Sequence, residues 1–231
     1  MMLPETGTDL LSKSALSEFG FAIIPAGLAP DVAEILRATI FKVGRVSARC
    51  LLDRLIVRSV AIALGHQLSA AGLLGENAVA IQAIAFDKSP TANWKVGWHQ
   101  DTMFPLAARP TAPGFELPSI KEGVDYARPR REILEDLLAV RLHLDDCDEA
   151  NGPLRVAPGS HRHGILRSTE IPDCVARHGE MRCLAQAGDA LLMKPLLLHA
   201  SSPATAPRHR RVLHLVYYSG DPIAEKWHRS V

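Results

Sequence analysis

The sequence contains few cysteines and no CxxC pair. Its 4 cysteines are widely spaced along the chain, at Cys50, Cys147, Cys174 and Cys183. The N-terminal residues, MMLPETGTDL, also lack the charged-then-apolar pattern of a secretory signal. Both absences favour a reducing compartment, and we expect the protein in the cytoplasm.

Excess charge and a long uninterrupted apolar run are absent too. The formal net charge is +1 at pH 7, so the composition indicates binding neither to nucleic acid nor to a membrane surface. The most apolar stretch runs from Leu55 to Gly75, but Arg58 and His66 interrupt it, which a bilayer span rarely tolerates near its middle. We expect a buried helix here. No feature indicates an oligomeric state.

No linker or repeat divides the chain. Of its 231 residues 47% are hydrophobic, which is enough for a substantial core, and we expect a single domain over residues 1–231. One stretch, from Thr102 to Arg131, is rich in proline, which forbids long regular elements. Because long irregular loops in compact domains are usually functional, we expect residues 102–131 to form an irregular lid over a substrate.

Helix signals dominate residues 1–77. Thr8 can cap a first helix, and Pro30 with Asp31 can open a second. Ser47 can open a third helix over the long apolar segment. The first third of the chain is therefore expected to be mostly helical.

The pattern changes at Ala78 to short apolar or alternating runs bounded by Gly, Pro, Asn and Asp, as strands are. About eight such runs follow: AVAIQAIAF, WKVGWH, LAVRLHLDD, PLRVAP, MRCLA, ALLMK, LLLHAS and RRVLHLVYY. Strands without alternating helices predict a sandwich or jelly roll rather than a parallel α/β sheet. We expect a mainly β fold with a jelly-roll core over residues 78–219 and flanking helices packed outside one sheet.

Two HxD motifs are candidate metal-ligand pairs. His99 and Asp101 lie in GWHQDT, and side chains two residues apart in an extended chain point to the same face. An imidazole and a carboxylate could therefore meet on one cation. His143 and Asp145 in RLHLDD satisfy the same argument. The strand count favours His99 only modestly, so both pairs stay open on spacing alone.

A late strand should supply the third ligand, because a jelly roll places early and late strands side by side. His199 closes the apolar run MKPLLLH, although a histidine at a strand end can also simply face solvent. Two histidines and one carboxylate leave three open positions on iron(II), the pattern of non-haem oxygenases. A 2-oxo acid bound there needs a bidentate cation, and three arginines that could also be solvated compete for this role: Arg208, Arg210 and Arg211.

Four ordered stretches resemble the phytanoyl-CoA dioxygenase family: FDKSPTANWKVGWHQD, RLHLDDCDEANGPLRVAPGSH, GDALLMKPLLLHASS and RHRRVLHLVYYS. The resemblance implies a double-stranded β-helix, the cupin-like jelly roll, which uses Fe(II), 2-oxoglutarate and O2. It implies that His99, Asp101 and His199 are the metal ligands and that His143 is not. It also implies that Arg210 anchors 2-oxoglutarate.

Three further residues match cavity positions of the family. Ser201 matches a position that commonly helps to hold the same carboxylate. Arg141 and Gln82 match strands that line the cavity, where they could contact 2-oxoglutarate or substrate, although Arg141 could equally belong to a surface salt network. The presence of Asp101 implies oxygenation, because halogenating relatives leave that carboxylate position vacant.

The resemblance therefore implies a dioxygenase that hydroxylates, or otherwise oxidises, a C–H bond of a small-molecule substrate and releases succinate and CO2. Two other classes use similar histidines. A cupin-type metal-dependent isomerase or hydrolase does not need Arg210, and a non-catalytic metal-binding module needs no co-substrate. Release of succinate separates the first class from both others.

Overall fold

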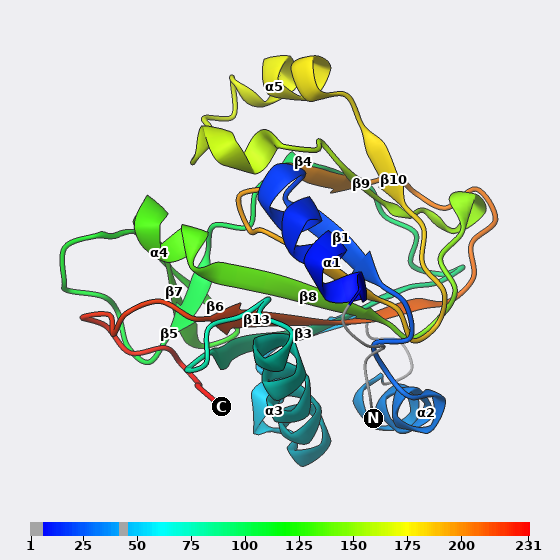
Figure 1. The fold of residues 1–231 in the computed structure, drawn as a ribbon, viewed down its shortest axis with the longest axis horizontal. Helices are drawn as coiled ribbons and strands as arrows, with labels where there is room; N and C mark the ends of the chain where they lie inside the picture. Colours follow the sequence, from blue (N-terminus) through cyan, green and yellow to red (C-terminus); the bar gives the residue numbers. More distant parts are fainter. Residues whose placement is uncertain (1–6, 42–45) are drawn as a thin grey trace.

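Two antiparallel sheets lie at the centre of the molecule (Figure 1). The computed structural model describes residues 7–41 and 46–231. The larger sheet has the order β1-β11-β8-β13-β3-β2, with bounds Phe21–Ile24, Ala190–Met193, Leu137–His143, Arg210–Tyr218, Val79–Lys88 and Ser47–Ala48. The smaller has the order β10-β9-β12-β4, with bounds Met181–Cys183, Leu154–Val156, His199–Ser201 and Val96–His99. The fold is a jelly roll, as the strand pattern predicted.

All eight predicted runs contain strands of these two sheets. The longest two, β13 and β3, pair antiparallel along their whole length, and β8 pairs with the other edge of β13. The larger sheet also takes in β1 and β2 from the N-terminal third, where the sequence pattern predicted helices alone. The sheet core therefore extends further toward the N-terminus than residue 78.

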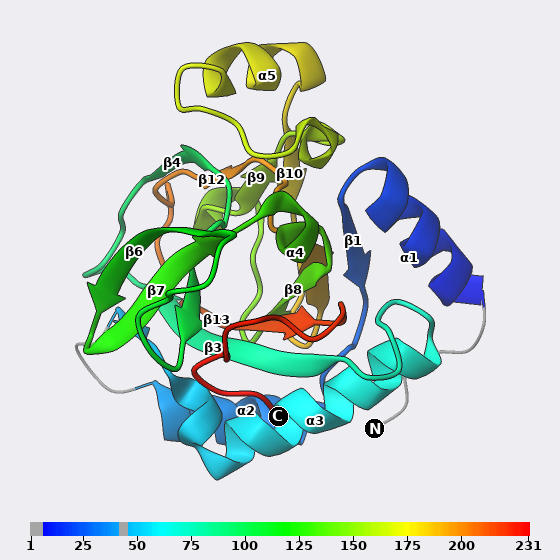
Figure 2. The ribbon, with the colours of Figure 1, turned by 90° about the vertical axis from the view of Figure 1, so that its left-hand side faces the viewer.

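Helices cover the outer face of the larger sheet. α2 (Pro30–Ile40) and α3 (Leu55–Ala70) lie against it, and α1 (Gly7–Glu18) lies beside β1 (Figure 2). The core beneath them includes Leu36, Leu64, Leu213 and Leu215, which are 0%, 1%, 0% and 0% exposed. Because the central strands are buried on both faces, they are almost continuously apolar. Packing of helices outside one sheet is confirmed.

Pro30 opens α2 as predicted, but the other two predicted helix starts were wrong. α1 begins at Gly7, so Thr8 lies inside the helix and not at its cap. Ser47 lies in β2 on the sheet edge, and α3 begins only at Leu55. The sheet edge supplies the backbone hydrogen bonds that a helix would otherwise supply, and this gain is invisible in a local sequence pattern.

A second core fills the space between the two sheets. Ile81, Leu137 and Val216 belong to it and are 1%, 0% and 1% exposed. Farther along the same strands the buried side chains become polar, with Arg141 on β8 and His214 on β13. Buried polar groups are costly unless they have partners or a ligand, so this end of the sandwich is where a site is expected.

The expectation of an irregular lid was wrong in its structure. Residues 102–131 contain all three strands of a third antiparallel sheet of order β5-β7-β6, with bounds Phe104–Leu106, Val124–Pro129 and Phe115–Lys121. Its prolines occupy positions that a sheet tolerates, since Pro118 lies at a register shift in β6 and Pro129 is the last residue of β7. Proline shortens these strands without preventing them.

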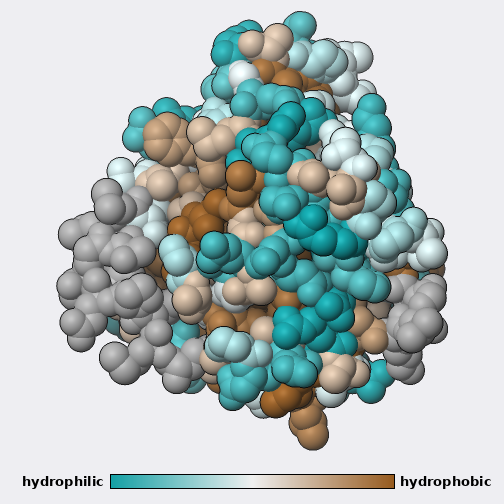
Figure 3. All heavy atoms as spheres, turned by 90° about the vertical axis from the view of Figure 1, so that its right-hand side faces the viewer, coloured by the Kyte–Doolittle hydropathy of each residue, from teal (hydrophilic) through white to brown (hydrophobic). Residues whose placement is uncertain are grey.

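Short helices and polar loops complete the surface. They are α4 (Arg131–Glu135), α5 (Ile171–His178) and the 3-10 turns Leu51–Asp53, Glu149–Asn151 and Ser160–His163. On the face drawn in Figure 3, hydrophilic side chains cover most of the surface and hydrophobic atoms gather in a narrow central band. Within the described ranges, no helix has both the length and the apolar character needed to cross a membrane.

Truncation of Leu36 should test how strongly α2 is held to the sheet. Leu36 is 0% exposed, so Leu36→Ala should lower the free energy of unfolding by about 2–5 kcal/mol through the cavity it leaves. Ile35 precedes it on α2 and is 46% exposed, so Ile35→Ala should cost under about 1 kcal/mol. Urea unfolding followed by circular dichroism measures both, and equal costs would contradict this packing.

Candidate functional site

Three side chains of types that can ligate a metal converge where β4 meets β12. His99 ends β4 and stands opposite His199, the first residue of β12, in the antiparallel ladder. Their ring centroids are 4.1 Å apart. Asp101 follows just beyond β4, with its Oδ1 3.8 Å from His99 Nε2 and its Oδ2 3.6 Å from His199 Nε2. Two imidazoles and one carboxylate therefore present ligand atoms within 4.8 Å of one another.

Backbone carbonyls orient both imidazoles. His99 Nδ1 lies 2.8 Å from the oxygen of Gly97, and His199 Nδ1 lies 2.9 Å from the oxygen of Leu197. A carbonyl oxygen only accepts, so each Nδ1 donates and each Nε2 keeps its lone pair toward Asp101. This is the tautomer that a metal ligand needs.

The protonation states of the group also suit a cation. Burial lowers the pKa of His199 to about 4, so its imidazole is neutral at pH 7. Burial alone would raise the pKa of Asp101, but its interactions with His199, His214, His99 and Arg141 hold that pKa below its ordinary value. A neutral imidazole and an ionised carboxylate are the forms that bind metal.

Gln100 lies between His99 and Asp101 in the sequence, and its side chain holds the residues after β4 in place through hydrogen bonds. Its Nε2 donates to the carbonyl oxygens of Gly164 and Leu196, both at 2.7 Å, and its Oε1 accepts from the amide of Leu166 at 2.9 Å. The backbone amide of Asp101 also donates to the oxygen of Pro195 at 2.9 Å. These bonds tie the residues after β4 to the chain just before β12, which keeps His99, Asp101 and His199 together.

A cavity of about 340 Å³ is lined by His99, Asp101 and His199. Its described lining includes a single acidic residue, Asp101, and five lysines and arginines: Arg49, Lys88, Lys121, Arg141 and Arg210. Apolar side chains, among them Ile84, Phe86, Trp94 and Leu154, supply much of the remaining wall. A cavity with this charge excess suits an anionic ligand.

The inner basic end of the cavity consists of Arg210, Lys88 and Ser201, which are 5%, 1% and 3% exposed. Arg210 donates to the oxygen of Gly152, and its Nε has no hydrogen-bond partner in the described part of the chain. Lys88 Nζ donates to Ser201 Oγ at 2.6 Å and to the oxygen of Ser202 at 2.8 Å. Burial and the nearby Arg210 lower the pKa of Lys88 to about 8.

Lys88 is a site residue that the motif analysis missed. It shares one face of β3 with Gln82, Ile84 and Phe86, and all four line the cavity. Side chains on a strand alternate with period two, so the assignment of Gln82 to a cavity wall could have been extended along β3 to Lys88.

Arg141 and Gln82 both line the cavity, as the resemblance implied. Arg141 is buried beside His214, with 3.5 Å between its Nη1 and His214 Nδ1, and its guanidinium lies 5.7 Å from the Phe86 ring. Burial lowers the pKa of Arg141 to about 10, so it stays charged at pH 7. The Oε1 of Gln82 has no partner among the residues that the structure describes. Both side chains are therefore open to a ligand.

The rival pair, His143 and Asp145, does not form a site. Asp145 accepts from Arg211 through the backbone amide, Nε and Nη2 at 2.8, 2.8 and 2.7 Å, which uses both carboxylate oxygens. His143 is buried, and burial lowers its pKa to about 3. Neither residue belongs to a group of potential metal ligands among the described residues.

Tertiary contacts also separate the three competing arginines. Arg208 lies at the surface and pairs with Asp148 at 2.6 Å, while Arg211 is held by Asp145. Arg210 alone of the three lines the cavity. Residue type and spacing alone could not distinguish the three, whereas the family resemblance had singled out Arg210.

Part of this chain is similar in sequence to a named enzyme. L-proline trans-4-hydroxylase from Streptomyces griseoviridis is 30% identical over 108 residues, which are 36% of this chain and 40% of that protein. The chain thus matches less than half the length of this relative.

The same overall fold occurs in solved structures of low sequence identity. EctD from S. alaskensis, solved with 2-oxoglutarate and 5-hydroxyectoine, has a TM-score of 0.66 at 17% identity, covering 94% of this chain and 79% of that chain. HygX from Streptomyces hygroscopicus, solved with nickel and 2-oxoglutarate, has a TM-score of 0.63 at 15% identity, covering 93% and 87%.

A family model supplies the broadest sequence match. The model of phytanoyl-CoA dioxygenase matches residues 29–212, which include both histidines and the aspartate of the converging group. The match covers most of the chain, and its extent agrees with the jelly-roll strands described above. The chain therefore belongs to the phytanoyl-CoA dioxygenase family of non-haem iron and 2-oxoglutarate dependent oxygenases.

Proposed function

We propose that this chain is an Fe(II)- and 2-oxoglutarate-dependent dioxygenase that oxidises a C–H bond of a small molecule and releases succinate and CO2. The observation that carries the proposal is one cavity with two parts. At one place it presents two imidazoles and a carboxylate within 4.8 Å, and at another it presents buried cations without acidic partners. The first suits iron, and the second suits a dicarboxylate.

His99, Asp101 and His199 would hold the iron. Two histidines and one carboxylate are the donor set of non-haem iron oxygenases, and they leave three positions for co-substrate and oxygen. Bound iron(II), together with 2-oxoglutarate and dioxygen, supplies the oxidising chemistry. The carboxylate of Asp101 supports oxygenation and not halogenation, because a halide ligand needs that position vacant.

Arg210, Lys88 and Ser201 would hold the far carboxylate of 2-oxoglutarate. Two buried cations without a facing carboxylate are costly for a folded protein, and an anionic ligand removes that cost. Arg210 can donate two parallel hydrogen bonds, Lys88 adds a point charge, and the Ser201 hydroxyl adds a third donor. Arg141 and Gln82 would then contact 2-oxoglutarate or the substrate from the neighbouring wall.

The lid would close over the substrate. Lys121 on β6 and Tyr126 on β7 belong to the small sheet and line the cavity together with Arg49. Lys121 Nζ lies 4.9 Å from the Tyr126 ring, and Arg49 Nε lies 3.5 Å from Glu122. Two cations at this outer wall support a substrate with an anionic group, such as a free carboxylic or amino acid. L-proline, the substrate in the name of the proline hydroxylase relative, is an amino acid of this kind.

The chain would act as one domain in the cytoplasm. β1 and β2 from the helical third belong to the same sheet as β13, which supports a single unit. All four cysteines are free thiols, three of them buried, as suits a reducing compartment. Neither a cupin-type isomerase or hydrolase nor a metal-binding module would need the buried cations at the inner wall.

Succinate release tests the proposal directly. Protein supplied with Fe(II), 2-oxoglutarate and O2 should release succinate, and His199→Ala should abolish both iron binding and succinate because it removes a ligand. His143→Ala is the matched control: it should keep iron, with circular dichroism verifying the fold. The oxygenase assignment fails if no succinate forms with a broad substrate panel and 2-oxoglutarate does not bind. Loss of iron in folded His143→Ala would revive the rival pair.

The affinity for 2-oxoglutarate should depend on pH through Lys88. Its ammonium is charged below pH about 8 and loses its proton above, so affinity should fall as the pH rises past that value. Lys88→Met should bind 2-oxoglutarate about 10- to 100-fold more weakly at pH 7, since a hydrogen bond to a charged group contributes about 1.5–3 kcal/mol. Isothermal titration calorimetry measures both effects.

Two arginine variants serve as comparisons for Lys88→Met. Arg210→Ala should weaken 2-oxoglutarate binding while iron binding persists. Arg208→Ala, which removes the adjacent surface arginine, should leave affinity unchanged. An unchanged pH profile in Lys88→Met would show that another group causes the dependence.

Lys121→Met should raise the KM for an anionic substrate and leave the affinities for iron and 2-oxoglutarate unchanged, because Lys121 lies on the lid. The assay is substrate-stimulated succinate release, with small carboxylic and amino acids compared with their uncharged amides. Lys95→Met, an exposed lysine outside the cavity lining, is the control. Equal stimulation by acids and amides, or loss of iron in Lys121→Met, would count against this role of the lid.

A further inference from the structure

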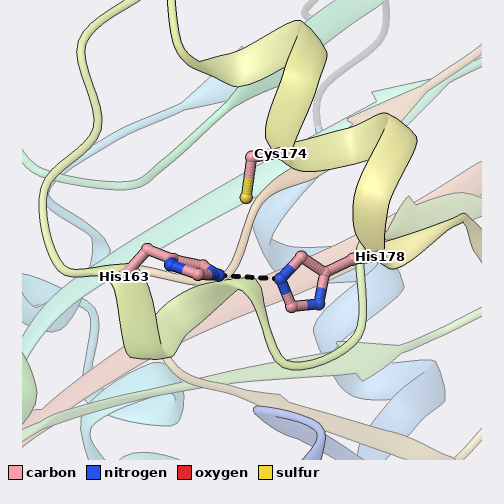
Figure 4. Close-up of side chains that lie close together, drawn as sticks. All are labelled: His163, Cys174 and His178. Atoms are coloured by element: carbon pink, nitrogen blue, oxygen red, sulfur yellow. Dashed lines mark hydrogen bonds between the residues drawn. The ribbon is translucent and has the colours of Figure 1, made fainter.

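A second group of metal-binding side chains lies outside the cavity. His163 is the last residue of the 3-10 turn Ser160–His163, and Cys174 and His178 lie four residues apart on α5 (Figure 4). Residues at i and i+4 share one face of a helix, so both side chains point the same way, toward His163. The ligand atoms of all three lie within 4.8 Å of one another.

We propose that His163, Cys174 and His178 bind a zinc ion, separately from the iron site. The two sites share no residue. Figure 4 shows the Cys174 thiol pointing toward the two imidazoles. A turn and a helix therefore supply three ligands to a single point.

The hydrogen bonds of His163 and His178 already leave one ring nitrogen, His178 Nε2, with its lone pair available to a metal. His178 Nδ1 lies 2.8 Å from the oxygen of Pro158 and must donate to it, so His178 Nε2 carries a lone pair. This is the arrangement that orients His99 and His199 in the cavity. His163 Nε2 lies 2.8 Å from His178 Nε2, so without a metal its proton is shared with that lone pair.

Metal binding would replace this shared proton. His163 is exposed, so its proton can move to Nδ1 and face water, which leaves both Nε2 atoms free to coordinate. The Cys174 thiol would release its proton to solvent and bind as thiolate. One proton thus leaves for each ion bound, and the coordinating set becomes two neutral imidazoles and one thiolate.

Zinc is the ion that this donor set prefers. Nitrogen and thiolate ligands suit zinc, whereas calcium and magnesium need oxygen ligands. Tetrahedral zinc bonds of about 2.0–2.1 Å to nitrogen place two such nitrogens roughly 3.3 Å apart, so the imidazoles would separate only slightly. The exposed position of His163 leaves a path for the ion, and water can occupy the fourth position.

The zinc site would stabilise the position of the strand that carries His199. Cys174 packs against Ala157 and Leu198. Ser160, at the start of the same turn as His163, accepts the amide hydrogen of Leu198 at 2.9 Å. A zinc ion joining α5 to this turn would therefore brace the residue that precedes His199. α5 lies at one end of the molecule, beyond the smaller sheet, as Figure 1 shows.

Titration of the metal-free full-length chain with Co²⁺ tests the proposal. Cobalt at this site should show a thiolate-to-metal charge-transfer band in the near ultraviolet, which the iron site cannot produce because it contains no cysteine. Cys174→Ser and His163→Gln should both lose the band, and the exposed position of His163 keeps that variant folded. Cys50→Ser removes a cysteine outside the group and should retain the band.

Two further measurements test whether the ion is zinc and whether it stabilises the fold. Zn²⁺ should displace the cobalt band at one ion per chain, and it should raise the Tm of the wild type by several degrees more than that of His163→Gln. The proposal is overturned if the wild type gives no charge-transfer band. It is equally overturned if His163→Gln keeps the band with unchanged affinity, since cobalt then binds elsewhere.

Discussion

The antiparallel pairing of β4 with β12 is the interaction on which the site depends. It sets His99 opposite His199, and backbone carbonyls two residues before each histidine then orient its ring. A slip of one residue would turn every side chain of β12 to the opposite face and move His199 away from the cavity. The bonds from Gln100 to Leu196 and from the Asp101 amide to Pro195 oppose such a slip, because they join the segment after β4 to the chain just before β12.

Uncompensated positive charge is the second constraint on the cavity. Lys88, Arg141 and Arg210 are buried around a wall on which Asp101 is the one acidic residue described. Burying cations without partners works against folding, and the sheets hold these side chains in place because their apolar neighbours pack well. Such a wall suits an anion, as a dicarboxylate co-substrate is.

Much of the fold could be predicted because strand patterns are local. The run LAVRLHLDD has the pattern of a strand wherever it lies in space, and it contains most of β8. The helix at Pro30 likewise begins with a local signal. The local pattern wrongly predicted an irregular structure for residues 102–131, because a proline at a register shift, such as Pro118, is compatible with a sheet. The local pattern also wrongly predicted a helix start at Ser47, because the strand that Ser47 pairs with is distant in the sequence.

The sequence by itself determined the strand order along the chain, the HxD motifs and the family-like stretches that favour His99 over His143. Only the tertiary structure decided which charges face one another. It placed Lys88 beside Ser201 and paired Arg211 with Asp145, and it brought Cys174 to His163. The physical reason is that a sequence motif indicates which ligand atoms are available but not where they lie. Binding requires ligand atoms from distant segments to lie within a few ångströms of one another, and only the packing of the fold sets those distances.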